Sequence, residues 1–284
     1  MPLDPVATLS KPAIVREQSY SERDVILYAL GLGLGRDPID SQELKYLYEK
    51  NLQVLPTYPV VLAAMSVGQM NLGINYTRLV HVEQRLVIHR PMQTAGTVVG
   101  SQRVTDVIDR GREKGALIVV DREILDKASG ELLATAGLTV LCRADGGFSD
   151  AIRPSEPVPE PPARKPDHSV ILATSPRAGL IYRLSGDLNP VHIDPDVARS
   201  AGFERPLLHG LATYGMMGWA IIKSCCEGSG GARLKELDGR FSQPVFPGDT
   251  LRIDIWSNNK EIVAQVIAVE RNVTVLKAGR ALLD

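Results

Sequence analysis

The string YRLSGDLNPVH places an acid, an amide and an imidazole within six positions, at Asp187, Asn189 and His192. Glycine, asparagine and proline favour bends, so the backbone between Asp187 and His192 can turn both side chains toward one point. A carboxyl group and an imidazole around a shared water form a general acid–base pair. Asn189 can hold that water or a substrate amide, which makes the loop a candidate for water chemistry.

A second histidine follows at His209, directly before Gly210 and the apolar run LATYGMMGWAII. The run is apolar nearly all round, which predicts a buried helix from about Leu208 to Cys226 that ends at Gly228. The first N–H groups of a helix attract anions, and Gly210 leaves its N–H accessible. Each feature alone is more typical of a solvated loop or a helix cap. Their joint placement favours a water-activating pair beside an oxyanion hole.

The elements around this stretch repeat along the chain. Tyr28-Ala-Leu-Gly-Leu-Gly followed by Asp37-Pro38 parallels Tyr182-Arg-Leu-Ser-Gly-Asp followed by Asn189-Pro190, and each copy runs into an apolar stretch, VLPTYPVVLAAM or PLLHGLATYGMM. Alternating strands then follow in both halves, as in ALIVVDREILD and EIVAQVIAVE. We expect an α+β architecture in which one continuous antiparallel sheet wraps two central helices, and Gly215 and Gly218 should let strands approach.

A proline-rich segment separates the copies. Residues 151–167 read AIRPSEPVPEPPARKPD, and proline cannot join a helix interior or donate to a sheet ladder. We therefore expect a first domain at 1–150, an extended linker at 151–167 and a second domain at 168–284. Before the long helix, Asp194-Pro195-Asp196 predicts a short capped helix that closes at Gly202.

The composition excludes several classes of protein. Among 284 residues, 32 Lys and Arg against 33 Asp and Glu give a net charge of −1, which argues against nucleic-acid or membrane-surface binding. No segment has the length of a membrane span or the form of a signal peptide. Cys142, Cys225 and Cys226 suggest a reduced chain without disulfides. The chain ends in RALLD, not in a peroxisomal address, so we expect a cytoplasmic location.

The string from Tyr182 to His192, followed by AGFERPLLHGL, resembles the hydratase 2 motif of MaoC-like dehydratases, the (R)-specific enoyl-CoA hydratases of the hotdog fold. DVILYALGLGLG, LKYLYEKNLQVLPTYPVV and HVEQRLVIHRPMQTAG resemble the N-terminal hotdog of two-hotdog hydratase 2 enzymes, and RFSQPVFPGDTL continues the match. The resemblance covers nearly the whole chain. It implies a double hotdog fold, a homodimer and hydration of trans-2-enoyl-CoA to (3R)-3-hydroxyacyl-CoA.

The resemblance also assigns residues. Asp187 and His192 would activate water, Asn189 would support them, and the Gly210 N–H would receive the thioester oxygen. His81-Val82 stands where the family has His-Gly, which adds a side chain, and Arg110 stands where it has Lys. The expected substrate-binding residues are His81, Val82, Arg110, Ser185, Gly186, Leu188, Pro190, Val191, His209 and Phe241.

No cofactor is implied, since the CoA thioester is the substrate. We expect no metal, because His192 and His209 lack a third histidine at ligand spacing. The Gly-rich run GLGLG follows a helix-like segment instead of a strand, which argues against a dinucleotide site. Open alternatives are a carrier-protein dehydratase, a thioesterase of the same fold and a non-catalytic acyl-CoA sensor. A basic rim for CoA phosphates or an acidic carrier would use Arg78, Arg85, Arg90 and Arg110.

Overall fold

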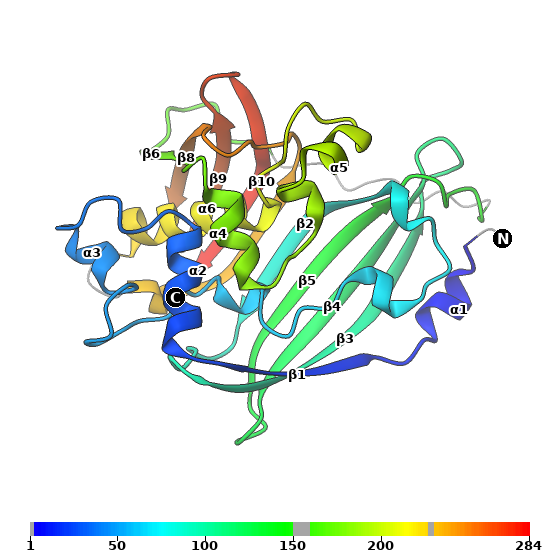
Figure 1. Cartoon of the computed structure of the whole chain (residues 1–284), viewed down its shortest axis with the longest axis horizontal. Helices are drawn as coiled ribbons and strands as arrows, with labels where there is room; N and C mark the ends of the chain where they lie inside the picture. The colour runs from blue at the N-terminus through cyan, green and yellow to red at the C-terminus, as the bar shows by residue number, and fades with distance from the viewer. Residues whose placement is uncertain (1–2, 150–159, 227–229) are drawn as a thin grey trace.

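A computed structural model describes residues 3–149, 160–226 and 230–284, which form one ten-stranded antiparallel sheet. The first half contributes β1 (Ile14–Tyr20), β2 (Leu79–Ile88), β3 (Gly96–Asp109), β4 (Ala116–Asp126) and β5 (Leu132–Cys142). The second half contributes β6 (His168–Ala173), β7 (Leu234–Phe241), β8 (Thr250–Asn258), β9 (Glu261–Ala268) and β10 (Val273–Leu283). Figure 1 shows this sheet as the body of the molecule.

The order of strands confirms the repeat. It runs β1-β3-β4-β5-β2 and then β7-β10-β9-β8-β6, so each half has the same order when read from its outer edge. The halves join where β2 pairs antiparallel with β7, from Glu83 opposite Arg240 to Val87 opposite Glu236. The predicted continuous sheet is therefore confirmed.

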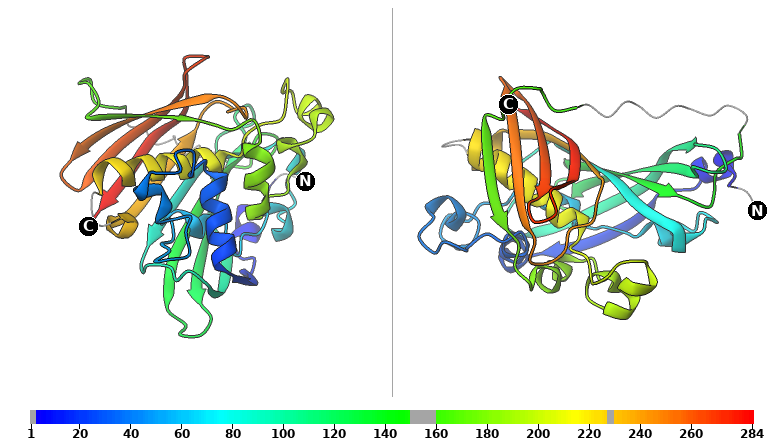
Figure 2. Two further views of the ribbon diagram at one scale, coloured as in Figure 1. Left: turned by 60° about the vertical axis from the view of Figure 1, so that its left-hand side comes forward. Right: turned by 90° about the horizontal axis from the view of Figure 1, so that it is seen from above.

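The helices are short except for α6 (Gly210–Cys225), which lies against the second half of the sheet (Figure 2). The other α-helices are α1 (Pro5–Leu9), α2 (Glu22–Gly31), α3 (Ser41–Leu44), α4 (Ala178–Tyr182) and α5 (Pro195–Ser200). The 3₁₀ turns are η1 (Tyr58–Val60), η2 (Val67–Met70), η3 (Tyr76–Arg78), η4 (Arg183–Ser185), η5 (Pro190–His192) and η6 (Gly230–Arg233). As predicted, the Asp194 side chain caps α5 by accepting from the backbone N–H groups of Asp196 and Val197.

The prediction of two central helices is wrong, because α6 is the one long helix in the part of the chain that the structure describes. The matching first-half stretch contains η1, η2 and η3, with Ala63 in the left-handed region at φ 47°. Pro56 and Pro59 in this stretch prevent a continuous helix. Buried side chains replace the missing backbone partners: Arg122 donates to the carbonyl of Val60 at 2.7 Å, and Gln102 donates to that of Met65 at 3.0 Å.

The apolar helix α6 is the centre of the larger core, and small residues let its neighbours approach. A side chain at Gly215 would stand 2.7 Å from Leu32 and 2.9 Å from the Tyr28 hydroxyl, and one at Gly218 would stand 2.6 Å from Thr57. The expected approach of a strand is found at Gly218, where Leu237 of β7 would stand 3.1 Å from such a side chain, and not at Gly215. At both glycines the nearest atoms belong to first-half segments outside the sheet, so the two halves share one core.

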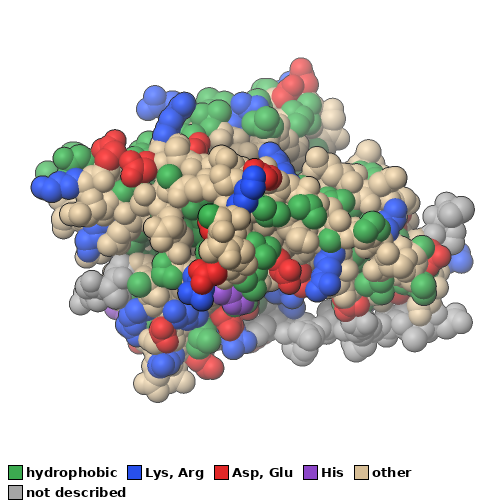
Figure 3. Space-filling model, turned by 90° about the horizontal axis from the view of Figure 1, so that it is seen from below, with side chains coloured by type: hydrophobic (Ala, Val, Ile, Leu, Met, Phe, Trp, Pro, Cys, Tyr) green, Lys and Arg blue, Asp and Glu red, His purple; other side chains and the backbone are tan. Residues whose placement is uncertain are grey.

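The surface carries mixed charge, with basic and acidic side chains interspersed over the face seen in Figure 3. Among the described residues, no helix has the length and apolar character to cross a bilayer. Residues 151–159 of the predicted linker lie outside the described ranges. Its remainder contacts the end of β8, where the Trp256 indole N–H donates to the Arg164 carbonyl at 2.8 Å.

Candidate active site

The stretch between α4 and α5 forms a tight loop whose short-range hydrogen bonds fix its path. Gly186 has φ 125°, a backbone conformation that other residues rarely adopt. Beyond this bend, the Asp187 carboxyl accepts from the Asn189 N–H at 3.1 Å, and the Asn189 side chain accepts from the Val191 N–H at 3.2 Å. This Asx-type capping starts η5, which ends at His192. We call residues 185–192 the Asp–His loop.

The loop brings the acid and the imidazole together, with His192 Nε2 3.9 Å from Asp187 Oδ2. His192 Nδ1 lies 3.0 Å from the carbonyl oxygen of Leu207. Since a carbonyl only accepts, Nδ1 carries the hydrogen and Nε2 keeps its lone pair toward Asp187. Burial lowers the pKa of His192, which outweighs the opposing effects of Asp187 and the Leu207 carbonyl. The ring is therefore a neutral base near pH 7.

His209 lies directly behind this pair. Its ring stacks on His192 with centroids 3.7 Å apart and an interplanar angle of 26°. Its Nε2 lies 3.1 Å from the Asp187 carbonyl oxygen, while its Nδ1 is buried without a partner among the described residues. Burial, together with the neighbouring His192, lowers the pKa of His209 to about 4.

The N-terminus of α6 opens beside the pair, because Gly210 is its first residue and His209 its N-cap. The first amides of a helix have no carbonyl one turn back to bond with, so the Gly210 N–H is available to an anion. A side chain at Gly210 would stand 3.2 Å from the Phe241 ring. Phe241 also meets the His81 ring edge-on, with centroids 5.0 Å apart.

His81 brings the first half of the chain into the site. Its Nε2 lies 2.8 Å from the Glu83 carbonyl, and burial lowers its pKa to about 4, against the attraction of Asp187. The irregular first-half segment approaches the loop as well, since the Val61 carbonyl oxygen lies 3.9 Å from where a Gly186 side chain would begin. The site is thus built between the two halves.

Asp187, His192 and His209 present donor atoms within 4.8 Å of one another, as a metal site would. Imidazoles bind metals in the plane of the ring, through the lone pair. The rings of His192 and His209 are stacked 3.7 Å apart, so their lone pairs do not converge on one ion. This geometry does not support a metal ion bound by these three residues, and the expected absence of a metal remains a prediction.

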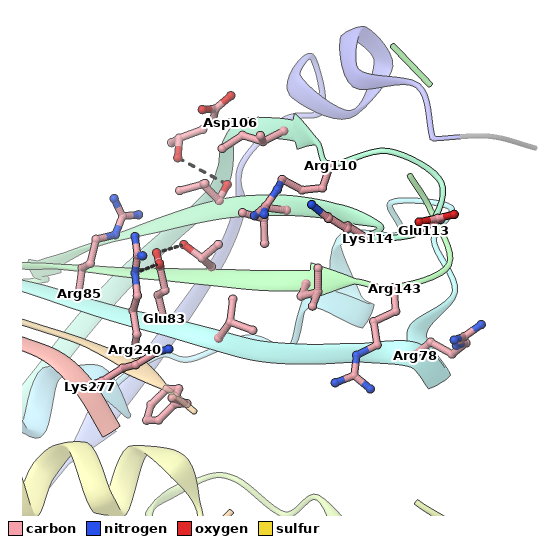
Figure 4. A pocket seen from close by; sticks show the side chains of 18 residues that line it. Arg78, Glu83, Arg85, Asp106, Arg110, Glu113, Lys114, Arg143, Arg240 and Lys277 are labelled. Atoms are coloured by element: carbon pink, nitrogen blue, oxygen red, sulfur yellow. Dashed lines mark hydrogen bonds and ion pairs between the residues drawn. The ribbon is translucent and has the colours of Figure 1, made fainter. Parts of the chain in front are cut away.

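A cavity of about 830 Å³ runs along the sheet near the site. Alternation along β2 puts Glu83 and Arg85 on the face opposite the buried Leu86, so the cavity lies on the outer face, away from α6. Its basic lining residues are Arg78, Arg85, Arg110, Lys114, Arg143, Arg240 and Lys277 (Figure 4), and its acidic ones are Glu83, Asp106 and Glu113. We call this cavity the basic trough.

The trough reaches the edge of the active site. The β2–β7 pairing stops at Glu83 opposite Arg240, and β2 has a bulge between His81 and Glu83. Val82, in that bulge, and Phe241 both line the trough, while the Phe241 ring also contacts His81 on the inner side. Phe241 therefore borders both the trough and the side chains around the acid–base pair.

The structure gathers most of the predicted residues, but not in one place. His209, Gly210, Phe241 and His81 lie around the acid–base pair of Asp187 and His192, whereas Val82 and Arg110 line the trough. The side chain of Leu188 points to solvent with 59% of its surface exposed, Pro190 and Val191 form η5, and Ser185 keeps a buried hydroxyl without a partner among the described residues.

Some assignments change and others are new. Arg90, expected in the basic rim, does not line the trough; it pairs with Glu131 at 3.0 Å. The sequence reasoning missed the Leu207 carbonyl that orients His192, and it missed Lys277. Tyr182 belongs to the repeat but had no predicted role, and in the structure its ring packs on His209 with centroids 5.1 Å apart.

Comparisons with known proteins agree with this geometry. Residues 18–144 match the MFE-2 hydratase 2 N-terminal domain, and residues 157–278 match the MaoC like domain. The peroxisomal enoyl-CoA hydratase 2 of Arabidopsis thaliana is 38% identical over 91% of this chain and 88% of that protein. The 3-hydroxyacyl-thioester dehydratase Y of Mycobacterium tuberculosis is 36% identical over 90% of this chain and 88% of that protein.

Solved structures confirm the expected fold. A MaoC-like dehydratase from Phytophthora capsici superposes with a TM-score of 0.85 at 30% identity, over 98% of this chain and 97% of that one. A protein of Mycobacterium tuberculosis described as a double hotdog fold superposes with a TM-score of 0.60 at 17% identity, over 99% and 98% of the two chains. The chain therefore belongs to the MaoC-like hydratase family, as a double hotdog protein with a hydratase 2 N-terminal domain ahead of its MaoC-like domain.

Proposed function

We propose that this protein is an (R)-specific 2-enoyl-CoA hydratase, which adds water reversibly to trans-2-enoyl-CoA and forms (3R)-3-hydroxyacyl-CoA. One observation carries the proposal: the 3.9 Å gap between His192 Nε2 and Asp187 Oδ2, beside the first amide of α6 at Gly210. The gap is too wide for a direct hydrogen bond and suits one water that contacts both atoms. Names of the similar proteins support the same chemistry.

The mechanism follows from these positions. Neutral His192 accepts a proton from the water through Nε2 while the water oxygen bonds to the β-carbon. The acid–base pair returns one proton to the α-carbon on the same face, so that its own proton count is unchanged. Negative charge grows on the thioester oxygen, where the Gly210 N–H stabilises it; one such donor contributes about 2.7 to 4 kcal/mol in other enzymes. No cofactor takes part in this scheme.

We assign the basic trough to the substrate's phosphates. Its lining has seven basic and three acidic side chains. Arg240 pairs with Glu83 and Arg85 pairs with Asp121, and the net positive charge that is left favours a polyanionic ligand. CoA carries its phosphates at one end and the thioester at the other, and Phe241, which lines the trough, also lies against His81 and Gly210. An acidic carrier protein would use the same charges, so a test must separate the two.

The first experiment follows the loss of enoyl-thioester absorbance with trans-2-enoyl-CoA of several chain lengths. Wild type should hydrate the substrate, and Asp187→Asn and His192→Gln should each lower kcat by at least about a hundredfold. His168→Gln, on the exposed edge strand β6, is the matched control and should stay active. Release of free thiol without loss of the double bond would instead indicate a thioesterase.

A second experiment tests the trough. Lys277→Ala and Arg143→Ala should raise KM for enoyl-CoA and leave the rate with the enoyl ester of N-acetylcysteamine unchanged, since that thioester lacks phosphates. Lys260→Ala, at the exposed turn after β8, is the control outside the trough. Added salt should raise KM for the CoA substrate. If only carrier-bound substrates respond to the two substitutions, the partner is a carrier protein.

We also propose a homodimer in the cytoplasm. The balanced charge of the chain supports the location, while a similar protein is named peroxisomal. Light scattering coupled to size exclusion should give twice the 30.9 kDa chain mass, and fluorescence of a tagged chain in its native cell should be diffuse. A monomer mass or punctate fluorescence would contradict the respective proposal.

A further inference from the structure

His209 contacts both members of the acid–base pair without lying between them. It is buried to 1% exposure, and one face of its ring stacks on His192. Its Nε2 lies 3.1 Å from the carbonyl oxygen of Asp187. Because that oxygen only accepts, Nε2 carries a hydrogen, and in the neutral ring Nδ1 is then the unprotonated nitrogen. The side chain therefore fixes the backbone at Asp187 and the ring plane of His192.

The same residue also begins α6. The Ala212 N–H donates to the His209 carbonyl at 3.0 Å, as the first bond of the helix, and the next residue is Gly210. The His209 side chain thus bonds to the Asp–His loop, while its backbone is joined directly to the Gly210 amide proposed for the thioester oxygen. A shift of the loop relative to α6 would break this bond, so His209 couples the position of the water to that of the thioester oxygen.

We propose that His209 is a positioning residue, which holds Asp187 and His192 in register with the Gly210 amide and does so as a neutral imidazole. The inference rests on the proposed function, because it presupposes that Asp187 and His192 handle the water. It replaces the expected role in substrate binding by an indirect one. Phe241 and Gly210 face the substrate side, and His209 lies behind them in the core.

The groups around His209 are His192 on one ring face, Tyr182 on another side, the loop at Asp187 and the more distant Arg183. Asp187 favours the charged form of His209, but burial outweighs it. Burial is the main cause that lowers the pKa of His209 to about 4, and His192 and Arg183 act in the same direction. When His192 takes a proton from water, it therefore does not meet a second cation across the 3.7 Å stack.

Two substitutions separate the hydrogen bond from the stacking. His209→Phe keeps an aromatic ring against His192 and removes the donor to Asp187. His209→Gln places an amide N–H near the position of Nε2 and removes the ring. Each protein is first compared with wild type by circular dichroism and by Tm, so that loss of fold is not mistaken for loss of positioning. His168→Gln serves again as the control.

The two variants should differ in kinetics. In His209→Phe, kcat should fall on the order of ten- to a hundredfold, because the Asp187 carbonyl loses its partner. KM should stay within about twofold, since no substrate contact is lost. In His209→Gln, water gains access to His192, whose pKa should rise toward the ordinary imidazole value near 6.5. The acid limb of kcat/KM should therefore move to higher pH in His209→Gln and not in His209→Phe.

Nitrogen-15 NMR of the histidines gives a readout that needs no turnover, and the chain has only 5 histidines to assign. We expect the Nε2–H tautomer for His209, the Nδ1–H tautomer for His192, and no protonation of His209 above about pH 5. An Nδ1–H tautomer, a cationic His209 at pH 6, or wild-type kcat in His209→Phe would overturn the proposal. If wild type hydrates no enoyl thioester, the proposed function fails, and the tautomers and titrations still decide whether His209 holds the loop.

Discussion

His192 Nε2 and Asp187 Oδ2 face each other across 3.9 Å, and each residue is held by its own hydrogen-bond partner. His192 Nδ1 bonds to the Leu207 carbonyl, whereas the Asp187 backbone carbonyl bonds to His209. The spacing therefore does not depend on an ion pair between the two side chains. Because the Asp187 side chain is 47% exposed and that of His192 12%, water reaches the gap from the carboxylate side.

The pH dependence of the rate should report His192. Its pKa is lowered by burial, so the free enzyme keeps the base neutral down to pH values below the ordinary 6.5 of imidazole. We expect kcat/KM for an enoyl-CoA to stay level from pH 8 to about 6.5 and to fall only below that value. A pH–rate series in constant ionic strength checks this. An acid limb centred above about pH 7 would contradict the proposed state of His192.

The stability of the fold should depend on pH through His81. Its folded pKa is lowered to about 4, below the value near 6.5 of an unfolded chain, so the unfolded state binds more protons in between. The free energy of unfolding is therefore unaffected by His81 above about pH 6.5. As the pH falls from there toward about 4, it decreases by up to about 1.4 kcal/mol per pH unit. Urea unfolding at pH 7, 6, 5 and 4.5 measures this slope.

His81→Gln should make that slope smaller, because glutamine can still donate to the Glu83 carbonyl but does not titrate. The exposed His89, which bonds to the Thr135 hydroxyl at 3.0 Å, provides the matched variant His89→Gln. That variant should keep the wild-type slope. Equal slopes in wild type and His81→Gln would mean that His81 titrates normally in the folded chain.

Much of the fold could be predicted because the repeat leaves local patterns. Alternating apolar residues in β4 and β9 identified central strands, and the common order of parts in both halves predicted one continuous sheet. The edge strands β1 and β6 were not identified. Their burial is low and their pairing with β3 and β8 supplies the stabilisation, which local sequence does not reveal.

The local parts of the candidate site could also be predicted from the sequence, whereas its long-range contacts could not. The spacing of Asp187 and His192 within one loop and the helix start at Gly210 are local features, and the structure brings them together. His209 and His192 are 17 positions apart, and they stack because the chain turns back between η5 and α6. No local sequence pattern encodes this contact. The basic trough collects side chains from both halves, including Lys277, for the same reason.

Gly186 should be required for activity beyond its effect on stability. Alanine at φ 125° should destabilise the fold by about 1 to 2 kcal/mol and displace Asp187, which follows directly. Gly202, with φ 89° just after α5, offers a matched strain away from the pair. Gly186→Ala should lose most of kcat, whereas Gly202→Ala should lower Tm and retain kcat. Equal kcat values in the two variants would show that the bend does not place the acid.

Gly210 and Phe241 should be energetically coupled. A methyl group at Gly210 would stand 3.2 Å from the Phe241 ring, so Gly210→Ala should displace the ring, which also contacts His81. Alanine keeps the backbone N–H, and a loss of rate would therefore come from the displaced ring and not from a missing donor. In a double-mutant cycle of kcat/KM, Phe241→Leu should relieve part of that loss, with a coupling of about 0.5 to 3 kcal/mol. Additive losses would mean that the Phe241 ring does not set the substrate's position at the Gly210 amide. Glycine would then be required at 210 because the thioester itself must come close to the backbone there.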